Sequence, residues 1–132
     1  MREEARLWID DALRTFKIAK ENYSLGFYDV SVFLCQQSLE KMLKGSLIAL
    51  RKGQIVKTHK LFTLYKRVAN RVHLSDELIN FLKHITPFYT ITRYPDVSMG
   101  LPIDVISDKF AEECIEKTGK ILSCFQKVIL KQ

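Results

Sequence analysis

The sequence predicts an all-α protein, an up-and-down bundle of four to five helices. Apolar residues recur at steps of three and four along most of the chain, which is the period of an amphipathic helix. Only 5 Gly and 3 Pro occur in 132 residues, too few for turn-rich β architecture. No segment shows a convincing strand pattern. The length suits a single domain, which we expect to span 1–132.

The first helix is expected from about residue 2 to about residue 24. Its apolar stripe follows helical spacing: Trp8, Ala12, Phe16, Ala19 and Tyr23. Four charged residues lie off this stripe and should face solvent: Arg6, Asp10, Arg14 and Lys17. We expect Gly26 to end the helix, because glycine commonly occupies the position after a helix.

The second and third helices are likewise predicted from capping residues and from apolar positions at helical spacing. Asp29 is a favourable N-cap, and the apolar face that follows runs to about Leu50, with Gly53 as the expected stop. A basic connection covers 51–57. Thr58 is the expected cap of the third helix, whose apolar positions share helical spacing: Leu61, Leu64, Tyr65 and Val68.

The last two helices have hydroxyl residues at their starts. Ser75, which two acidic residues follow, predicts the start of a fourth helix that ends at Thr86 or continues past Pro87. Residues 86–106 hold all three prolines and are expected to be irregular; loops of this length are often functional. Ser107 or Asp104 is the expected cap of the final helix. Its stripe is Phe110, Cys114, Thr118, Ile121, Phe125 and Val128.

Positive charge is concentrated in one third of the chain. Between Lys41 and Ser75 there are nine Lys or Arg residues and no Asp or Glu. The remaining residues hold 21 − 9 = 12 basic against 15 acidic side chains, a net charge of −3. This asymmetry indicates an anionic partner, which could be a nucleic acid, a nucleotide or an acidic protein surface. A basic surface that is merely solvated is the alternative.

Cysteine usage and hydropathy exclude several classes of protein. The three cysteines, Cys35, Cys114 and Cys124, form no CxxC pair, so neither a disulfide framework nor a zinc site is predicted, and no cofactor is expected. Cys35 and Cys114 should be buried. No apolar run approaches the roughly 18 residues of a membrane span. Residues 1–6 include acids and lack an apolar signal-peptide core. We expect a cytoplasmic protein with no membrane association.

Three segments carry a family resemblance. They read QQSLEKMLK at 36–44, KTHKL at 57–61 and RYPD at 93–96. In this order and at these distances they resemble the HEPN domain family, whose pattern is a QQxxEKxLK helix, a KTHxL helix start and an RYPD loop. With the first and last helices, the likeness covers nearly the whole chain.

The resemblance implies a bundle of four to five helices that is usually a homodimer. HEPN proteins are often encoded beside a minimal nucleotidyltransferase, and many serve in toxin–antitoxin or defence systems. Several branches cut RNA without a metal, using an Arg followed after four to six residues by a His near the start of a late helix. The His would act as general base or acid at the 2′-hydroxyl, and the Arg would stabilise the charged, phosphorane-like transition state.

This chain departs from that nuclease motif. Arg93 lies in the corresponding region, but no His follows it. Arg67 and His73 have the spacing, yet they lie too early, between the third and fourth helices. On a continuous helix, six residues turn through roughly 600°, which leaves the two side chains about 120° apart. The remaining candidates for catalysis are Arg93 and His59.

Six residues are predicted to bind nucleotide or RNA: Arg93, His59, Lys57, Lys41, Lys44 and Asp96. A guanidinium matches phosphate oxygens with two hydrogen bonds, and a helix start favours anions. Structural alternatives remain open for several of them. Arg93 could pair with Asp96, His59 could bond locally at a helix start, and Lys44 could pair with Glu40.

Two groups of side chains add to this prediction. Tyr89 and Tyr94 could stack on a base or simply pack against the bundle. At least one of Gln36 and Gln37 must face the bundle, where a buried amide needs partners from a polar network or a dimer contact.

Three functions fit these observations. The leading hypothesis is a HEPN module that binds nucleotide or RNA through residues 41–73 and Arg93 and acts with a nucleotidyltransferase partner. The second is a metal-independent ribonuclease toxin. The third is a homodimeric scaffold whose charge serves an acidic protein. Apolar residues left exposed on a small bundle would suit a dimer.

Overall fold

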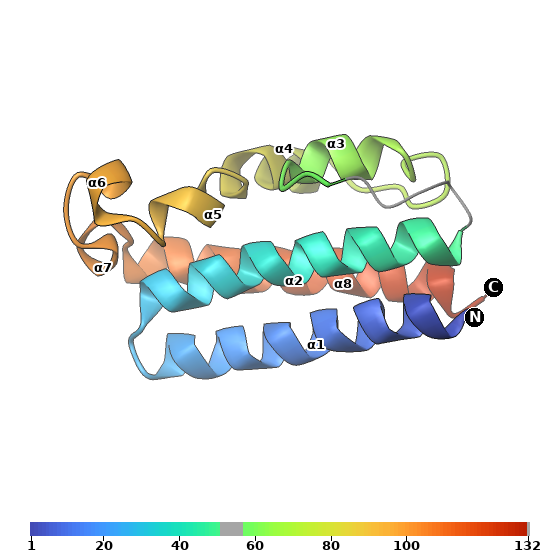
Figure 1. Ribbon diagram of the computed structural model, residues 1–132, viewed down its shortest axis with the longest axis horizontal. Helices are drawn as coiled ribbons and strands as arrows, with labels where there is room; N and C mark the ends of the chain where they lie inside the picture. Colours follow the sequence, from blue (N-terminus) through green and yellow to red (C-terminus); the bar gives the residue numbers. More distant parts are fainter. Residues whose placement is uncertain (51–56, 132) are drawn as a thin grey trace.

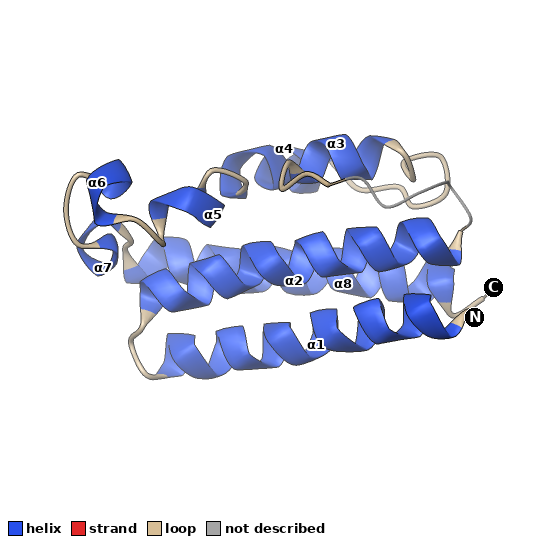
Figure 2. Ribbon diagram, viewed as in Figure 1, coloured by secondary structure: helices blue, strands red, loops and turns tan. Residues whose placement is uncertain are grey.

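The computed structural model describes residues 1–50 and 57–131. Three helices of 22 residues run the length of the molecule: α1 (Glu3–Ser24), α2 (Tyr28–Ala49) and α8 (Asp108–Ile129). Five shorter helices lie between α2 and α8: α3 (Leu61–Lys66), α4 (Asp76–Ile85), α5 (Phe88–Ile91), α6 (Pro95–Ser98) and α7 (Pro102–Val105). The described residues form no strand (Figure 2), which confirms the all-α prediction.

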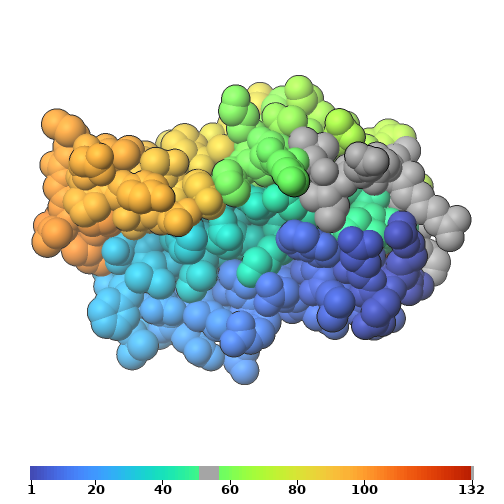
Figure 3. Space-filling model, in the orientation of Figure 1, coloured from blue at the N-terminus to red at the C-terminus, as the bar shows by residue number. Residues whose placement is uncertain are grey.

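The chain runs up and down the molecule, as predicted (Figure 1). A tight turn joins the antiparallel helices α1 and α2. From the far end of α2 the chain returns through α3, α4 and α5, and α8 then runs back beside α2. Short helices therefore form the fourth side of the bundle. Seen in space-filling form, residues of α3 to α6 make up one long side, with α1 on the opposite side (Figure 3).

The turn between α1 and α2 depends on a glycine, as predicted. Gly26 has a φ of 85°, in the left-handed region that favours glycine. Its N–H donates to the Tyr23 carbonyl at 3.0 Å, and the Phe27 N–H donates to the Asn22 carbonyl at 2.9 Å. These two bonds form a Schellman motif, which satisfies carbonyls that the end of α1 would otherwise leave unpaired.

Small residues bring α1 and α2 close together. Ala5 and Ala12 of α1 are fully buried, and the Ser38 hydroxyl of α2 donates to the Ala12 carbonyl at 2.7 Å. A Cβ atom added at Gly45 would lie 2.9 Å from both Trp8 Cβ and Ile9 Cγ1. The predicted stripe of α1 is therefore only partly right. Its alanines are buried, its aromatic members are half-buried, and Ala5 and Ile9 complete the buried face.

Two helix starts match the sequence prediction. The Ser75 hydroxyl accepts a hydrogen bond from the Leu78 N–H at 3.3 Å at the start of α4, and the Ser107 hydroxyl accepts one from the Phe110 N–H at 3.0 Å at the start of α8. Asp104, the alternative cap of the last helix, lies inside α7 instead.

Two other helix starts differ from the prediction. α2 begins at Tyr28 without a side-chain cap, so Asp29 lies in its first turn. Thr58 does not cap α3, because that helix begins only at Leu61. The Leu61 N–H instead donates to the Thr86 hydroxyl at 3.3 Å, and that hydroxyl donates to the Leu82 carbonyl at 2.7 Å. Thr86 therefore ties the start of α3 to the end of α4.

The proline-rich segment is more regular than predicted. α4 stops at Ile85, one residue before Thr86, and 86–106 then contains three single-turn helices in place of one irregular loop. Pro95 and Pro102 each occupy a first turn, where the missing N–H of proline costs nothing. The stop expected at Gly53 lies outside the described residues.

The core fills the space between the long helices and the short ones. Its largest fully buried side chains include Leu39, Leu43, Leu64, Leu82 and Phe125. They come from α2, α3, α4 and α8, so the short helices are held by the same core as the long ones. No helix in the described part of the chain is long and apolar enough to cross a membrane.

Candidate functional site

One face of α2 supplies the base of the site. Phe33, Gln36, Glu40 and Lys44 follow one another at steps of three and four, so they line up along the helix. Gln36 is fully buried, and Glu40 and Lys44 are 7% and 8% exposed. This face of α2 lies against two elements. Gln36 and Glu40 contact His59 in the segment that leads into α3, and Phe33 contacts Tyr89 of α5.

Glu40 is the centre of a buried polar network. Its Oε2 accepts a hydrogen bond from Lys44 Nζ at 2.9 Å, and its Oε1 lies 2.8 Å from His59 Nδ1. A longer contact of 3.4 Å joins Gln36 Nε2 to the same Oε1. A carboxylate removed from water needs a cation and hydrogen-bond donors. Lys44 supplies the cation, so the predicted Glu40–Lys44 pair is confirmed.

Gln36 fixes the backbone of the segment that precedes α3. Its Nε2 donates to the His59 carbonyl at 3.3 Å, and its Oε1 accepts from Gln37 Nε2 at 2.7 Å. This is the polar network that the sequence predicts for the two glutamines. α2 therefore holds His59 twice, by its main chain through Gln36 and by its ring through Glu40.

The His59 ring is held on two sides and open elsewhere. It stacks on Tyr89 of α5, with ring centroids 3.8 Å apart and planes inclined by 16°. The side chain is nevertheless 49% exposed. Because Nδ1 faces the Glu40 carboxylate, it carries the proton, and Nε2 is the ring nitrogen left for an external group. None of the hydrogen bonds among the described residues uses Nε2.

Arg93 joins the same cluster from the turn after α5. Its Cζ lies 4.9 Å from the ring centroid of Tyr89, 5.4 Å from that of Tyr94 and 5.8 Å from that of Phe33. The predicted alternative, an ion pair between Arg93 and Asp96, is wrong, because the ion pairs of the described residues include neither side chain. Guanidinium groups that stack on rings keep their in-plane N–H donors available for an anion.

We call Glu40, His59, Tyr89 and Arg93 the His59–Arg93 site. The structure brings together the two residues that the sequence favoured for catalysis, although 34 positions separate them along the chain. The arrangement offers a guanidinium, aromatic rings and an imidazole oriented by a carboxylate. Such a site can bind a phosphate, stack on a base and move a proton.

The other predicted binding residues lie apart from this centre or are already paired. Lys41 Nζ lies 2.7 Å from Asp11 Oδ2 and 3.0 Å from Thr15 Oγ1, so it faces α1. Lys44 is buried against Glu40, and its Nζ lies 5.9 Å from the Trp8 ring centroid. Three further residues are exposed: Lys57, which precedes His59 by two positions, Asp96 on α6, and Arg67 just after α3. His73 is also exposed, in the connection before α4.

Sequence reasoning missed the part that Glu40 plays. It gave Glu40 only a possible pair with Lys44, whereas the carboxylate also contacts the His59 ring. A signal was present, because Glu40 lies four residues after Gln36 and both therefore share a face of α2. Phe33, one turn earlier on that face, was likewise assigned only to the apolar core.

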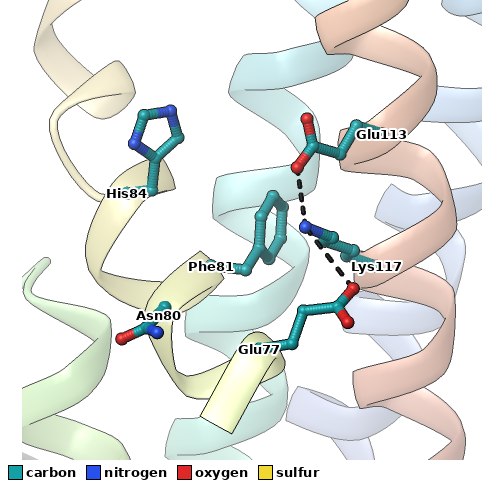
Figure 4. Close-up of a pocket in the computed structure, with 6 residues that line it drawn as sticks. All are labelled: Glu77, Asn80, Phe81, His84, Glu113 and Lys117. Carbon is teal, nitrogen blue, oxygen red and sulfur yellow. Dashed lines mark hydrogen bonds and ion pairs between the residues drawn. The ribbon is translucent and has the colours of Figure 1, made fainter.

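A separate pocket of about 350 Å³ lies between α4 and α8 (Figure 4). Within it Lys117 Nζ lies 2.7 Å from Glu113 Oε1 and 3.6 Å from Glu77 Oε1, above the Phe81 ring. The hydrogen bond to Glu113 raises the pKa of Lys117. The charged groups of this pocket pair with one another, and no predicted site residue lines it.

The cysteines expected in the core are there. Cys35 and Cys114 are fully buried, and Cys124 is half-buried. Burial raises the pKa of Cys35 to about 12, and it also raises the pKa of Cys114. Because the thiolate is the reactive form, these two thiols are inert at neutral pH.

The HEPN domain family matches residues 5–128. The chain belongs to the HEPN domain family. The chain is also similar to solved structures: a crystal structure of TT1696 from Thermus thermophilus superposes with a TM-score of 0.84 at 28% identity, covering 96% of this chain and 98% of that one. ST0689, an archaeal HEPN homologue, gives a TM-score of 0.78 at 28% identity, with 98% and 99% covered.

Sequence similarity also reaches a protein that is described as a proposed toxin, MJ1304 of Methanocaldococcus jannaschii. The two are 27% identical over 128 residues, which covers 89% of this chain and 83% of MJ1304. The HEPN resemblance first drawn from the three segments of α2, the α3 start and the α5–α6 turn is thus confirmed at the level of the family.

Proposed function

We propose that this HEPN chain is a toxin-like module that binds nucleotide or RNA at the His59–Arg93 site. The observation that carries the proposal is the environment of Arg93. Its guanidinium stacks near three aromatic rings, and no ion pair or hydrogen bond among the described residues uses its side chain. A cation held in place without a carboxylate partner is suited to a phosphate that comes from outside the chain.

Binding of a labelled mononucleotide and of a labelled single-stranded RNA tests this proposal. We expect Arg93→Ala to weaken binding of both ligands by at least about tenfold, because a charge-assisted hydrogen bond to phosphate contributes about 1.5–3 kcal/mol. Arg14→Ala, which removes an exposed arginine of α1, is the matched control and should bind like the wild type. Equal affinity of the wild type and Arg93→Ala would reject the His59–Arg93 site as the binding site.

A second candidate function is metal-independent cleavage of RNA, and a specific contact favours it. Glu40 Oε1 lies 2.8 Å from His59 Nδ1, which leaves Nε2 as a base on a ring that contacts Tyr89, as Arg93 also does. Nε2 would take the proton of a ribose 2′-hydroxyl as its oxygen bonds to the adjacent phosphorus. The bond from phosphorus to the 5′-oxygen then breaks, and that oxygen takes a proton from water. The products are a 2′,3′-cyclic phosphate and a 5′-hydroxyl.

Incubation of labelled RNA with the protein in EDTA separates binding from cleavage. A nuclease of this kind would cut in the chelator, and both His59→Ala and Arg93→Ala would abolish cutting. His73→Ala is the control, because His73 is also exposed but belongs to the alternative Arg67–His73 spacing. Intact RNA would leave binding as the function, whereas cutting that only His73→Ala abolishes would move the catalytic site to that pair.

The proposal includes two protein partners, a second copy of the chain and a minimal nucleotidyltransferase. The segment from α6 to α7 exposes several apolar side chains, as interfaces do: Val97, Met99, Leu101 and Val105. We expect light scattering to give twice the 15.4 kDa mass of the chain. We also expect co-purification with a nucleotidyltransferase encoded next to its gene. A monomer at micromolar concentration, or failure to co-purify, would reject the corresponding partner.

A further inference from the structure

Two lysines on α3 and α4 converge on a single aromatic ring outside the His59–Arg93 site. Lys83 Nζ lies 4.3 Å from the ring centroid of Phe62, and Lys66 Nζ lies 5.4 Å from the same centroid. Both lysines are exposed, and the ring is half-buried against the core. Phe62 is held by packing, and ammonium groups from two different helices lie near its ring.

No carboxylate neutralises this pair within the described residues. The ion pairs there include neither Lys66 nor Lys83. Glu77, the acid of α4 that forms an ion pair, faces Lys117 of α8 instead. Like charges held near one ring repel each other, so an anion that pairs with either ammonium group lowers the free energy of the arrangement. Lysines beside an aromatic ring are also the composition of surfaces that bind single-stranded nucleic acid.

The start of α3 and the end of α4 connect this lysine pair to the His59–Arg93 site. Phe62 follows Leu61, whose N–H donates to Thr86 at 3.3 Å, and Lys83 lies one helical turn before Thr86. His59, two residues before Leu61, stacks on Tyr89 of α5, which lies three residues after Thr86. Both groups therefore lie on the side of the bundle built from α3, α4 and α5 (Figure 1).

We infer that Phe62, Lys66 and Lys83 form a second phosphate subsite, which binds the backbone of a single-stranded RNA whose neighbouring nucleotide occupies the His59–Arg93 site. The inference rests on the proposed function and narrows it, because a ligand with a nucleotide at one subsite and a neighbouring phosphate at the other contains more than one nucleotide. The preferred ligand is thus an oligonucleotide.

The test compares a labelled mononucleotide with a single-stranded RNA of about eight nucleotides, within the usual range for one binding module. The wild type should bind the oligonucleotide more tightly. Lys66→Ala/Lys83→Ala should weaken oligonucleotide binding several-fold and leave mononucleotide binding unchanged. The slope of log affinity against log salt should become shallower by about 0.7, since loss of one phosphate contact on a single strand removes about 0.7 from the slope.

The matched control is Lys17→Ala/Lys20→Ala on α1. It removes the same charge, and Lys20 also lies over a ring, with its Nζ 4.9 Å from the centroid of Phe16. This variant should keep the affinity and most of the salt slope of the wild type. An equal loss in both double variants would mean that only net charge matters, and would overturn the subsite.

The two proposals fail in different ways. Oligonucleotide binding that Lys66→Ala/Lys83→Ala leaves unchanged overturns the subsite and assigns the lysines to another partner, such as an acidic protein. Mononucleotide binding that depends on Arg93 would still stand in that case. Absence of binding of either ligand by the wild type would instead reject the proposed function itself.

Discussion

The two long sides of this HEPN bundle differ in the length of their helices and in how closely those helices pack. On one side α1, α2 and α8 are 22 residues each, and small residues such as Ala12 and Gly45 let backbones approach closely. On the other side α3 to α7 are 4 to 10 residues long, and their turns expose cations and rings. Long helices tolerate few changes of shape, whereas short helices let several chain segments meet at one point. The long helices thus form the closely packed side of the bundle, and the short helices form the side that carries the candidate site.

The largest effect is expected where the two sides meet. Glu40→Ala leaves Lys44 buried without its partner, and removal of one member of a buried ion pair costs about 3–5 kcal/mol of the free energy of unfolding. Urea unfolding measures this loss. Glu40→Met/Lys44→Met removes both charges and should recover most of it. Wild-type stability of Glu40→Ala would mean that the pair is not buried in solution.

A smaller loss should follow from crowding the interface of α1 and α2. Gly45→Ala places a Cβ atom 2.9 Å from Trp8 Cβ, so the free energy of unfolding should fall by about 1–3 kcal/mol. At Gly119→Ala the nearest atom is the ring tip Phe16 Cζ at 3.3 Å, which can move. That variant should be neutral or stabilised by up to about 1 kcal/mol. Equal thermal unfolding of both variants would contradict the close helix approach.

Substitution of alanine for two glycines in turns should change the free energy of unfolding in opposite directions. Gly26→Ala forces alanine into a left-handed conformation, at a cost of about 1–2 kcal/mol. Gly100→Ala meets no neighbour within 4 Å and has no positive φ, so it should stabilise the protein by about 0.4–1 kcal/mol through the unfolded state. Chemical denaturation of the pair checks both signs. Destabilisation by both substitutions would mean that the turn after α6 is as constrained as the turn after α1.

The smallest effect on stability is expected at Arg93, the residue proposed to bind phosphate. Arg93→Ala removes an exposed side chain with no hydrogen bond or ion pair among the described residues, so the free energy of unfolding should change by less than about 0.5 kcal/mol. The same variant should lose ligand binding. A stability loss comparable to that of Glu40→Ala would make Arg93 a structural residue and would remove the contrast between the two sides.

The long helices and their core could be read from the sequence because both follow from local chemistry. Helical spacing located α1, α2 and α8, and the Ser75 and Ser107 caps marked two starts correctly. The start of α3 could not be read, because its first N–H is satisfied by Thr86, which lies 25 residues away. A partner that distant leaves no local pattern. The single-turn helices after Pro87 were missed for a related reason, since such short pieces have no period to detect.

The sequence indicated which residues are candidates for the site better than it indicated how those residues are arranged. Arg93 and His59 were identified from residue type and motif, and Tyr89 was named as a stacking candidate. Their meeting depends on how α5 packs against the start of α3, which spacing alone does not give. The alternative ion pair between Arg93 and Asp96 shows the limit, because closeness in sequence suggested a contact that is absent among the ion pairs of the described residues.

The double role of Glu40 has an evolutionary consequence. The same carboxylate neutralises Lys44 and orients His59, so natural selection for a folded chain preserves it whether or not the chain still acts on a ligand. A descendant that lost His59 would keep Glu40 for stability alone. We therefore expect Glu40 to be retained among relatives more widely than His59 and Arg93, which would be retained together only where the proposed binding is.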